Sequence, residues 1–314
     1  MTGLWLRRAF MAAACASVAL LAACGSSTTV SALTPARFIV FGDAFTDLGV
    51  AGAGKYTVND GAVDNWVQKM AASYGQTVAS TADGGTAYSR GNARVTSAVD
   101  AAGGAAPSIT AQITNFLVAG SFGLSDVAVV SGGVSDVIVQ VSAAASGTQT
   151  SAAMLDNAGL AGRELAAQVR RLVTAGAKYV IVTGTYDLSR TPWGAANVTL
   201  AKQASSKFND EFLVSIVDLG ANVLYVDAAF YYNLVTATPT SYAFTNASTA
   251  VCTSVDPGPG IGTGDGKVNS SLCNPATVGG LDYSKYVFAD GVYVTPLAHR
   301  LFGDYAYSRM KARF

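Results

Sequence analysis

Four short apolar runs recur at wide intervals along the chain. Each is four or five residues long, rich in β-branched side chains, and without the polar alternation of a half-exposed strand. The four runs are 37–41 (RFIVF), 127–130 (VAVV), 179–182 (YVIV) and 223–226 (VLYV). Strands of a parallel sheet have this pattern because helices cover both of their faces. We therefore predict four buried parallel strands.

Apolar residues at helical spacing occupy the segments between these runs. Three stripes stand out: Val63, Trp66, Val67, Met70 and Tyr74; then Leu160, Leu165, Val169 and Leu172; then Phe208, Phe212, Ile216 and Leu219. Gly176 and Gly220 follow the second and third stripes, and we expect them to end those helices. Strands alternating with helices predict an α/β fold with right-handed crossovers. Sites in such sheets lie at the carboxyl ends of the strands.

The composition excludes several classes of protein. Half of the residues (50%) are hydrophobic and 13% are charged, which is incompatible with a disordered chain. Twenty basic and 20 acidic residues give no net charge, so we expect no nucleic-acid partner, whose phosphates demand a basic surface. The single histidine, His299, excludes a metal site built on two imidazoles. We expect no metal and no cofactor.

The amino-terminal segment has the pattern of an export signal. Arg7 and Arg8 precede the apolar run 9–23, as in a secretory signal peptide. The sequence Leu-Ala-Ala-Cys-Gly at 21–25 resembles the processing box of bacterial lipoproteins. This resemblance implies a signal over 1–23, acylation of Cys24, a polar tether over 24–36, and attachment to the outer membrane. An ordinary secreted protein, cut nearby, is the alternative.

The remaining cysteines predict a disulfide. Cys252 and Cys273 form an even pair in an oxidising compartment and bracket a stretch rich in glycine and proline. Neither CxxC spacing nor histidine partners accompany them, which argues against zinc or redox chemistry. We therefore predict a structural bridge that closes the loop 252–273.

Four ordered motifs then resemble those of a known family. The segments are 38–49 (FIVFGDAFTDLG), 88–94 (YSRGNAR), 130–136 (VSGGVSD) and 288–295 (FADGVYVT). They are similar to the four blocks of the SGNH/GDSL lipases and esterases, whose first block reads F-G-D-S-x-x-D-x-G. The resemblance covers about 37–314. It implies one domain with a flavodoxin-like three-layer α/β/α sandwich, a mainly parallel central sheet, and hydrolysis of carboxylic esters.

The chain departs from the family at the positions that react. Ala44 stands where the family has its nucleophilic serine, and a methyl group cannot attack a carbonyl. Tyr293 replaces the histidine base, although its acidic partner Asp290 is retained. A phenol with an ordinary pKa near 10 is a poor base at neutral pH. Ser135 replaces the oxyanion asparagine, whereas Gly91 matches the oxyanion glycine of the second block.

Other polar residues of these blocks are predicted to be structural. Asp43 and Asp47 are expected to accept hydrogen bonds from backbone amides around the turn after the first strand. We expect His299 to make a structural hydrogen bond, because helical spacing turns it away from Tyr293. Asp136 belongs to the same structural group. If burial raised its pKa, Asp43, Asp136 or Asp290 could instead act as a carboxylate base.

Two hypotheses of different class follow. The favoured one is a lipid-anchored envelope pseudoenzyme that binds an ester, lipid or glycan ligand, or a partner, in the former catalytic pocket. The alternative is a working carboxylic-ester hydrolase, a lipase, esterase or acetyl-glycan esterase, with a rearranged site. An adaptor that uses the outer face of the domain is a third reading, which the sequence does not separate from the first.

Overall fold

The computed structural model describes residues 33–314 apart from 51, 52 and 64, so the predicted signal and Cys24 lie outside the described residues. The four predicted strands form one parallel sheet in the order β1-β2-β3-β4. Their bounds are β1 (Phe38–Gly42), β2 (Val127–Ser131), β3 (Tyr179–Thr183) and β4 (Val223–Tyr225). The prediction of a parallel α/β sheet is confirmed.

A further segment extends this sheet beyond β1. The backbone N–H of Val40 donates to Thr86 (3.0 Å), and the N–H of Tyr88 donates back to Val40 (2.7 Å). Residues 86–90 therefore run along the free edge of β1 and parallel to it. The second segment in the chain thus lies outside the first, and the direction of winding reverses between β1 and β2. Parallel sheets form their ligand sites at such a reversal.

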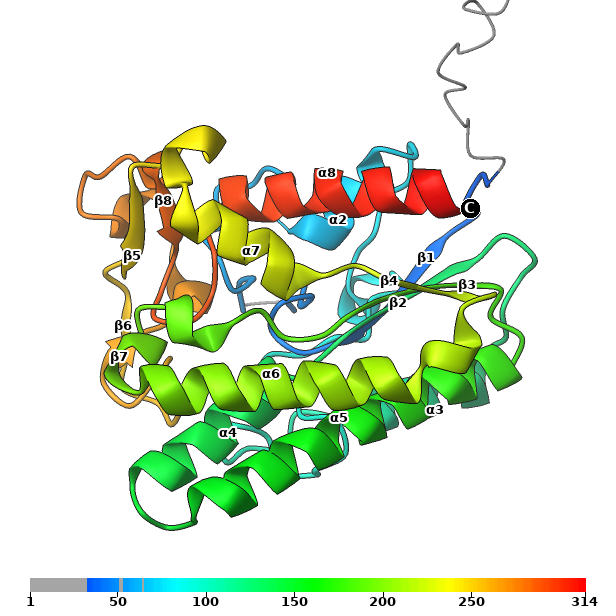
Figure 1. The fold of residues 1–314 in the computed structure, drawn as a ribbon. Helices are drawn as coiled ribbons and strands as arrows, with labels where there is room; N and C mark the ends of the chain where they lie inside the picture. Colours follow the sequence, from blue (N-terminus) through cyan, green and yellow to red (C-terminus); the bar gives the residue numbers. More distant parts are fainter. Residues whose placement is uncertain (1–32, 51–52, 64) are drawn as a thin grey trace, which may run out of the picture.

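Helices cover both faces of the sheet (Figure 1). On one side lie α2 (Trp66–Ala72), α7 (Ala228–Ala237) and α8 (Pro296–Arg313). On the other lie α3 (Ile109–Ala119), α4 (Val134–Ala145), α5 (Ser151–Thr174) and α6 (Val198–Ser215). This arrangement confirms the predicted three-layer α/β/α sandwich.

Three details of the helix prediction were wrong. Val63 precedes α2 and Tyr74 follows it. The helix begins only after the cap Asn65, whose side chain accepts from the N–H of Val67, and it ends at Ala72. Leu160 is 46% exposed because it lies five positions before Leu165, which is about 140° around a helix. Gly220 does not end α6: the helix stops at Ser215 and a 3-10 turn follows over Val217–Leu219.

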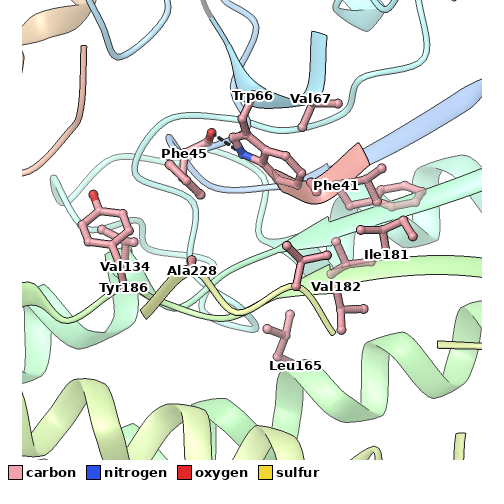
Figure 2. Close-up of a cluster of buried hydrophobic side chains, with 14 of the residues drawn as sticks. Phe41, Phe45, Trp66, Val67, Val134, Leu165, Ile181, Val182, Tyr186 and Ala228 are labelled. Carbon is pink, nitrogen blue, oxygen red and sulfur yellow. Dashed lines mark hydrogen bonds between the residues drawn. The ribbon is translucent and has the colours of Figure 1, made fainter. Parts of the chain in front are cut away.

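Figure 2 shows part of the buried core, in which Phe45 and Trp66 lie beside each other. The indole N–H of Trp66 donates to the backbone carbonyl of Phe45 at 3.1 Å. The ring of Phe45 contacts a group of surrounding rings: Trp66, Tyr186, Tyr232, His299 and Phe302. These contacts therefore fix the turn after β1 to the core.

A smaller subassembly lies at the carboxyl end of the sheet. It contains the strand pair β5 (Asn246–Ala250) with β8 (Tyr286–Phe288) and the hairpin of β6 (Val255–Asp256) with β7 (Lys267–Val268). Cys252 and Cys273 form the predicted disulfide here. Among the described residues, no helix is both long and apolar enough to cross a membrane.

Candidate active site

The four motif blocks converge where the strands end. The turn after β1 carries Asp43 and Ala44, residues 86–90 lead into Gly91, and the connection after β2 leads into Ser135 on the first turn of α4. The loop after β8 carries Asp290 and Tyr293. Two hydrogen bonds hold this loop over the sheet. The Tyr186 hydroxyl donates to the carbonyl of Val292 (2.8 Å), and the backbone N–H of Trp193 donates to the carbonyl of Gly291 (2.8 Å).

The end of β1 approaches β2 too closely for any side chain. A Cβ added to Gly42 would lie 2.4 Å from the carbonyl oxygen of Ser131, so only glycine fits. The buried amide of Gln112 on α3 fixes this backbone: its oxygen accepts from the Gly42 N–H (2.8 Å) and its nitrogen donates to the Gly42 carbonyl (2.9 Å). Sequence reasoning missed Gln112, because a lone glutamine on a helix carries no motif.

The nucleophile position holds a buried methyl group. Ala44 is 1% exposed and offers no atom for attack on a carbonyl. Its neighbour Asp43 accepts from the N–H of Phe45 at 3.1 Å through Oδ1, while Oδ2 has no protein partner. Burial raises the pKa of Asp43 to about 7, although the hydrogen bond from the Phe45 N–H opposes the shift. The neutral, protonated form of this carboxyl group is therefore favoured far more than in an exposed aspartate.

The base position holds a neutral phenol. Tyr293 is 1% exposed and its hydroxyl has no hydrogen-bond partner. Burial raises the pKa of Tyr293 well above its usual value, and the charge of Asp43 raises it further. Its ring packs edge-on against Tyr56, with the ring centres 4.9 Å apart. The hydroxyl cannot act as a base at neutral pH.

The carboxylate of Asp290 accepts hydrogen bonds from its own loop and from the disulfide-closed loop. Oδ1 accepts from the N–H groups of Val292 and Tyr293, both at 2.7 Å. Oδ2 accepts from the N–H of Ser270 at 2.9 Å and also from the Ser270 hydroxyl. Four donors saturate the oxygens, so this carboxylate joins the last block to the disulfide-closed loop instead of orienting a base. Sequence reasoning missed Ser270, whose one signal was its place inside that loop.

The backbone donor predicted for an oxyanion is already engaged. The N–H of Gly91 donates to Oδ2 of Asp47 at 2.6 Å, and Oδ1 of Asp47 accepts from the N–H of Gly49 at 2.9 Å. The Tyr56 ring packs directly on Gly91, because an added Cβ would lie 2.2 Å from the Tyr56 hydroxyl oxygen. Ser135 is fully buried and its hydroxyl has no partner.

Asp136 joins the second and third blocks. Its Oδ1 accepts from the Arg94 guanidinium at 3.1 Å and its Oδ2 accepts from the Val95 N–H at 2.9 Å. Burial raises the pKa of Asp136 to about 6 although the nearby charge of Arg94 opposes the shift. The bonds to both oxygens hold the start of α4 against the segment that follows Gly91.

His299 belongs to the core beneath the site. Its ring stacks on Phe45 with the ring centres 5.4 Å apart, and its Nδ1 has no hydrogen-bond partner. Burial lowers the pKa of His299 to about 3, while a hydrogen bond with the backbone of Tyr56 opposes the shift. The imidazole is therefore neutral throughout the physiological range.

Solvent reaches the molecule beside these residues rather than at them. Ala44, Ser135 and Tyr293 are at most 1% exposed. A cavity of about 530 Å³ opens at Gly291, next to Asp290, and Trp193, Asp265 and Lys267 line it with backbone of the disulfide-closed loop. In the part of the chain that the structure describes, no three His, Cys, Asp or Glu side chains are grouped as metal ligands.

Comparisons with known proteins give a partial sequence match and two solved structures at low identity. No protein-family model matches the chain. An uncharacterized protein from the trpE-trpG intergenic region of Pseudomonas putida is 28% identical over 160 residues, which make up 50% of this chain. The matched region spans only about a quarter (25%) of that relative's length.

Two solved structures align over 88% of this chain and 99% of their own. One is Est24, a carbohydrate acetylesterase from Sinorhizobium meliloti, at 15% identity and a TM-score of 0.45. The other is a candidate arylesterase from Agrobacterium tumefaciens, at 13% identity and a TM-score of 0.45. Neither alignment assigns a role to any residue here, so the roles below rest on this chain's own motifs and contacts.

Proposed function

We propose that this chain is a lipid-anchored cell-envelope protein with an SGNH/GDSL-type hydrolase domain that binds a ligand without hydrolysing it. The family assignment rests on the four ordered blocks, which lie together at the carboxyl ends of β1, residues 86–90 and β2 and in the loop after β8. The anchor rests on the lipoprotein-type sequence around Cys24 and on the apolar run before it.

The main support for a loss of ester hydrolysis is the buried methyl group of Ala44. It stands at the nucleophile position, and the carboxylate that would orient a base is saturated by Ser270 and by backbone N–H groups. In serine hydrolases, loss of the nucleophile or the base removes about 10⁶-fold in turnover. Loss of an oxyanion donor costs roughly a further 10²–10³-fold where the effects are independent.

The ligand site that we propose is the cavity beside the former catalytic position. Trp193 supplies an aromatic surface, while Asp265 and Lys267 supply opposite charges. Convergent polar groups on an otherwise apolar cavity are typical of small-molecule sites. An ester, lipid or glycan ligand matches this lining.

One observation favours a working hydrolase instead. The pKa of Asp43 is about 7, which suits a general base, and the hydroxyls of Ser89 and Ser135 are buried without partners near the same strand ends. In that case an activated serine hydroxyl would attack the ester from a position other than 44.

The test is hydrolysis of p-nitrophenyl acetate, together with labelling by a fluorophosphonate. We expect the native chain to match the buffer blank and to remain unlabelled. Hydrolysis by the native chain that is lost in Asp43→Asn, or labelling that is lost in Ser89→Ala or Ser135→Ala, would establish the rearranged hydrolase and overturn the pseudoenzyme.

Ala44→Ser/Tyr293→His, measured beside Ala44→Ser alone, asks whether the site still accepts an ester. Turnover by the double variant alone shows that the site fits an ester and lacks only the chemistry. In the native chain, titration with acetylated glycans and with short-chain esters is then followed by Trp193 fluorescence, with Trp193→Phe as the control. A saturable change that Trp193→Phe abolishes supports the cavity as the ligand site.

A further inference from the structure

The amino ends of the strands form one continuous face, opposite the candidate site and on the right in Figure 1. Five segments build this amino face: 33–37, 118–126, 170–178, 214–222 and 309–314. Side-chain bonds join them in two groups. Arg37 binds Asp126 in the first, and in the second Arg170 binds Asp218, Asn222 donates to the carbonyl of Lys178, and Arg313 donates to the carbonyl of Gly220.

The most exposed large apolar side chains of the described residues all lie on this face. Val118 is 83% exposed, Val217 80%, Leu124 77% and Val214 72%, and no other large apolar side chain in the described part of the chain exceeds 58%. Single exposed apolar residues are ordinary, but a concentration on one face marks a contact surface.

Positive charge is concentrated on the same face. Its five segments contain seven of the chain's 20 basic residues but only two of its 20 acidic residues. Both acids, Asp126 and Asp218, are paired with arginines of the face. The basic residues are Arg37, Arg170, Arg171, Lys178, Arg309, Lys311 and Arg313. A neutral protein thus has one strongly basic end.

A groove of about 530 Å³ lies along the outer side of α5 and reaches the amino face at its carboxyl-terminal end. Leu117, Ala167 and Ala175 line it with apolar groups, together with Arg170 and Arg171. Arg170 is paired with Asp218, whereas Arg171 donates to the neutral side chains of Gln168 and Thr114. Arginine presents several N–H donors to phosphate oxygens while its stem covers apolar surface. The apolar lining matches an acyl chain, and the charge of Arg171 attracts a lipid phosphate.

The chain leaves the domain at this face. Leu33 is buried, and the segment that follows is fixed because the Ala36 N–H donates to the Ser125 carbonyl at 3.0 Å. Cys24, the proposed acylation site, precedes Leu33 by nine residues, which span at most about 30 Å when fully extended. An anchor at Cys24 would therefore hold the amino face near the bilayer.

From these observations we propose that the amino face rests on an anionic phospholipid surface. Its exposed valines and leucine enter the headgroup region, and its lysines and arginines contact lipid phosphates. The candidate site then faces away from the bilayer that carries the anchor. This orientation rests on the anchor that we propose at Cys24.

The test uses the full chain, purified in detergent and reconstituted into vesicles. The vesicles contain phosphatidylcholine, phosphatidylglycerol as about a quarter of the lipid, and a nitroxide-labelled lipid that quenches fluorescence. A bimane label is placed at Val214→Cys or at Val198→Cys. Both valines are exposed and lie on α6, about 24 Å apart along the helix. We expect at least twofold stronger quenching at 214 than at 198, and less of it at high salt. Equal quenching at the two positions overturns the proposal.

Charge variants test the electrostatic part with matched changes. Lys178→Gln/Lys311→Gln removes two exposed lysines from the amino face, and Lys202→Gln/Lys285→Gln removes two exposed lysines elsewhere. We expect the first pair to reduce the excess quenching at 214 by at least half and the second to leave it unchanged. Equal effects of the two pairs would contradict the proposal.

The mass of the amino-terminal peptide tests the anchor separately. An acylated Cys24 with equal quenching at 214 and 198 sinks the membrane orientation but keeps the anchor. An unmodified Cys24 with stronger quenching at 214 sinks the anchor but keeps the lipid-binding face.

Discussion

At the scale of single residues, Asp43 and Tyr293 determine the protonation state of the candidate site. Burial favours the neutral form of both groups, and the charge of Asp43, when present, raises the pKa of Tyr293 further. The site therefore combines unreactive groups with buried polar atoms that have no protein partner: Asp43 Oδ2, Ser89 Oγ, Ser135 Oγ and Tyr293 Oη. Buried polar atoms without a partner are costly to stability.

Removal of the Tyr293 hydroxyl should not destabilise the fold. Tyr293→Phe removes a buried polar group that has no partner, so we expect an unchanged or higher free energy of unfolding, by up to about 1 kcal/mol. Tyr186→Phe is the matched control, because that hydroxyl donates to the Val292 carbonyl, and its loss should cost about 1 kcal/mol. Urea denaturation measures both. A larger loss for Tyr293→Phe would reveal a partner for its hydroxyl.

Asp43 should make stability depend on pH. Its pKa rises from 3.8 to about 7 on folding, so between these values the folded state binds more protons than the unfolded state. The stability that this carboxyl group contributes is complete below pH 3.8 and is lost as pH rises to about 7, with a slope of at most about 1.4 kcal/mol per pH unit.

Asp43→Asn should therefore gain stability relative to the native chain as pH increases from 4 to 7. His299 has the opposite sign, because its pKa is lowered to about 3 and its contribution is lost as pH falls below 6.5. Both chains share that term, so their difference isolates Asp43. The exposed Asp210→Asn serves as the control, and a flat difference for Asp43→Asn would contradict the raised pKa.

At the scale of elements, the disulfide-closed loop has become a structural partner of the last motif block. Ser270 on this loop binds the carboxylate of Asp290, and the Asn59 side chain donates to the carbonyl of Cys273 at 3.0 Å. A small second core surrounds the bridge: Val58, Val251, Cys252, Cys273, Val278 and Ala289. The loop therefore holds the candidate site and one wall of the adjacent cavity in place.

Removal of the bridge should loosen this end of the molecule. Cys252 and Cys273 are 21 positions apart, and a loop of this length contributes about 3 kcal/mol in the chain-entropy model. We expect Cys252→Ser/Cys273→Ser to lower the free energy of unfolding by about that amount. Ser270→Ala, which keeps the bridge, should cost about 1–3 kcal/mol through the buried carboxylate that it leaves under-bonded. Urea denaturation of both variants checks the ranking.

At the scale of the whole molecule, the two ends of the sheet differ in chemistry. The carboxyl end carries the four motif blocks, the disulfide-closed loop and the cavity at Gly291. The amino end carries the exposed apolar side chains and the excess of basic residues. Because the chain enters the domain at the amino end, attachment there would leave the cavity open to ligands.

Cys24→Ser should release the protein from the membrane. We expect the native chain to incorporate alkyne-labelled palmitate and to sediment with membranes, and the variant to lose the label. Cys15→Ser, which changes a cysteine inside the apolar run, should retain both properties. A labelled Cys24→Ser chain, or an unlabelled native chain, would contradict acylation at this residue.

Helices and strands could be predicted from the sequence where their burial produces a local pattern of apolar residues. The four strands were found because apolarity on both faces is itself visible along the chain, and the disulfide because two cysteines remained. Residues 86–90 were missed because their side chains are mixed and they pair with β1 only through an isolated bridge. Gln112 and Ser270 were missed because their partners, Gly42 and Asp290, are 70 and 20 positions away.

The sequence by itself determined the layer architecture, the motif positions and the absence of a hydroxyl at residue 44, since each follows from residue identity and local order. Only the tertiary structure decided the state of the site. Burial sets the pKa of Asp43, and long-range contacts commit Asp290 to Ser270 and the Gly91 N–H to Asp47. The difference between the two ends of the sheet also became visible only in the structure, because each end is built from segments that are distant in the sequence.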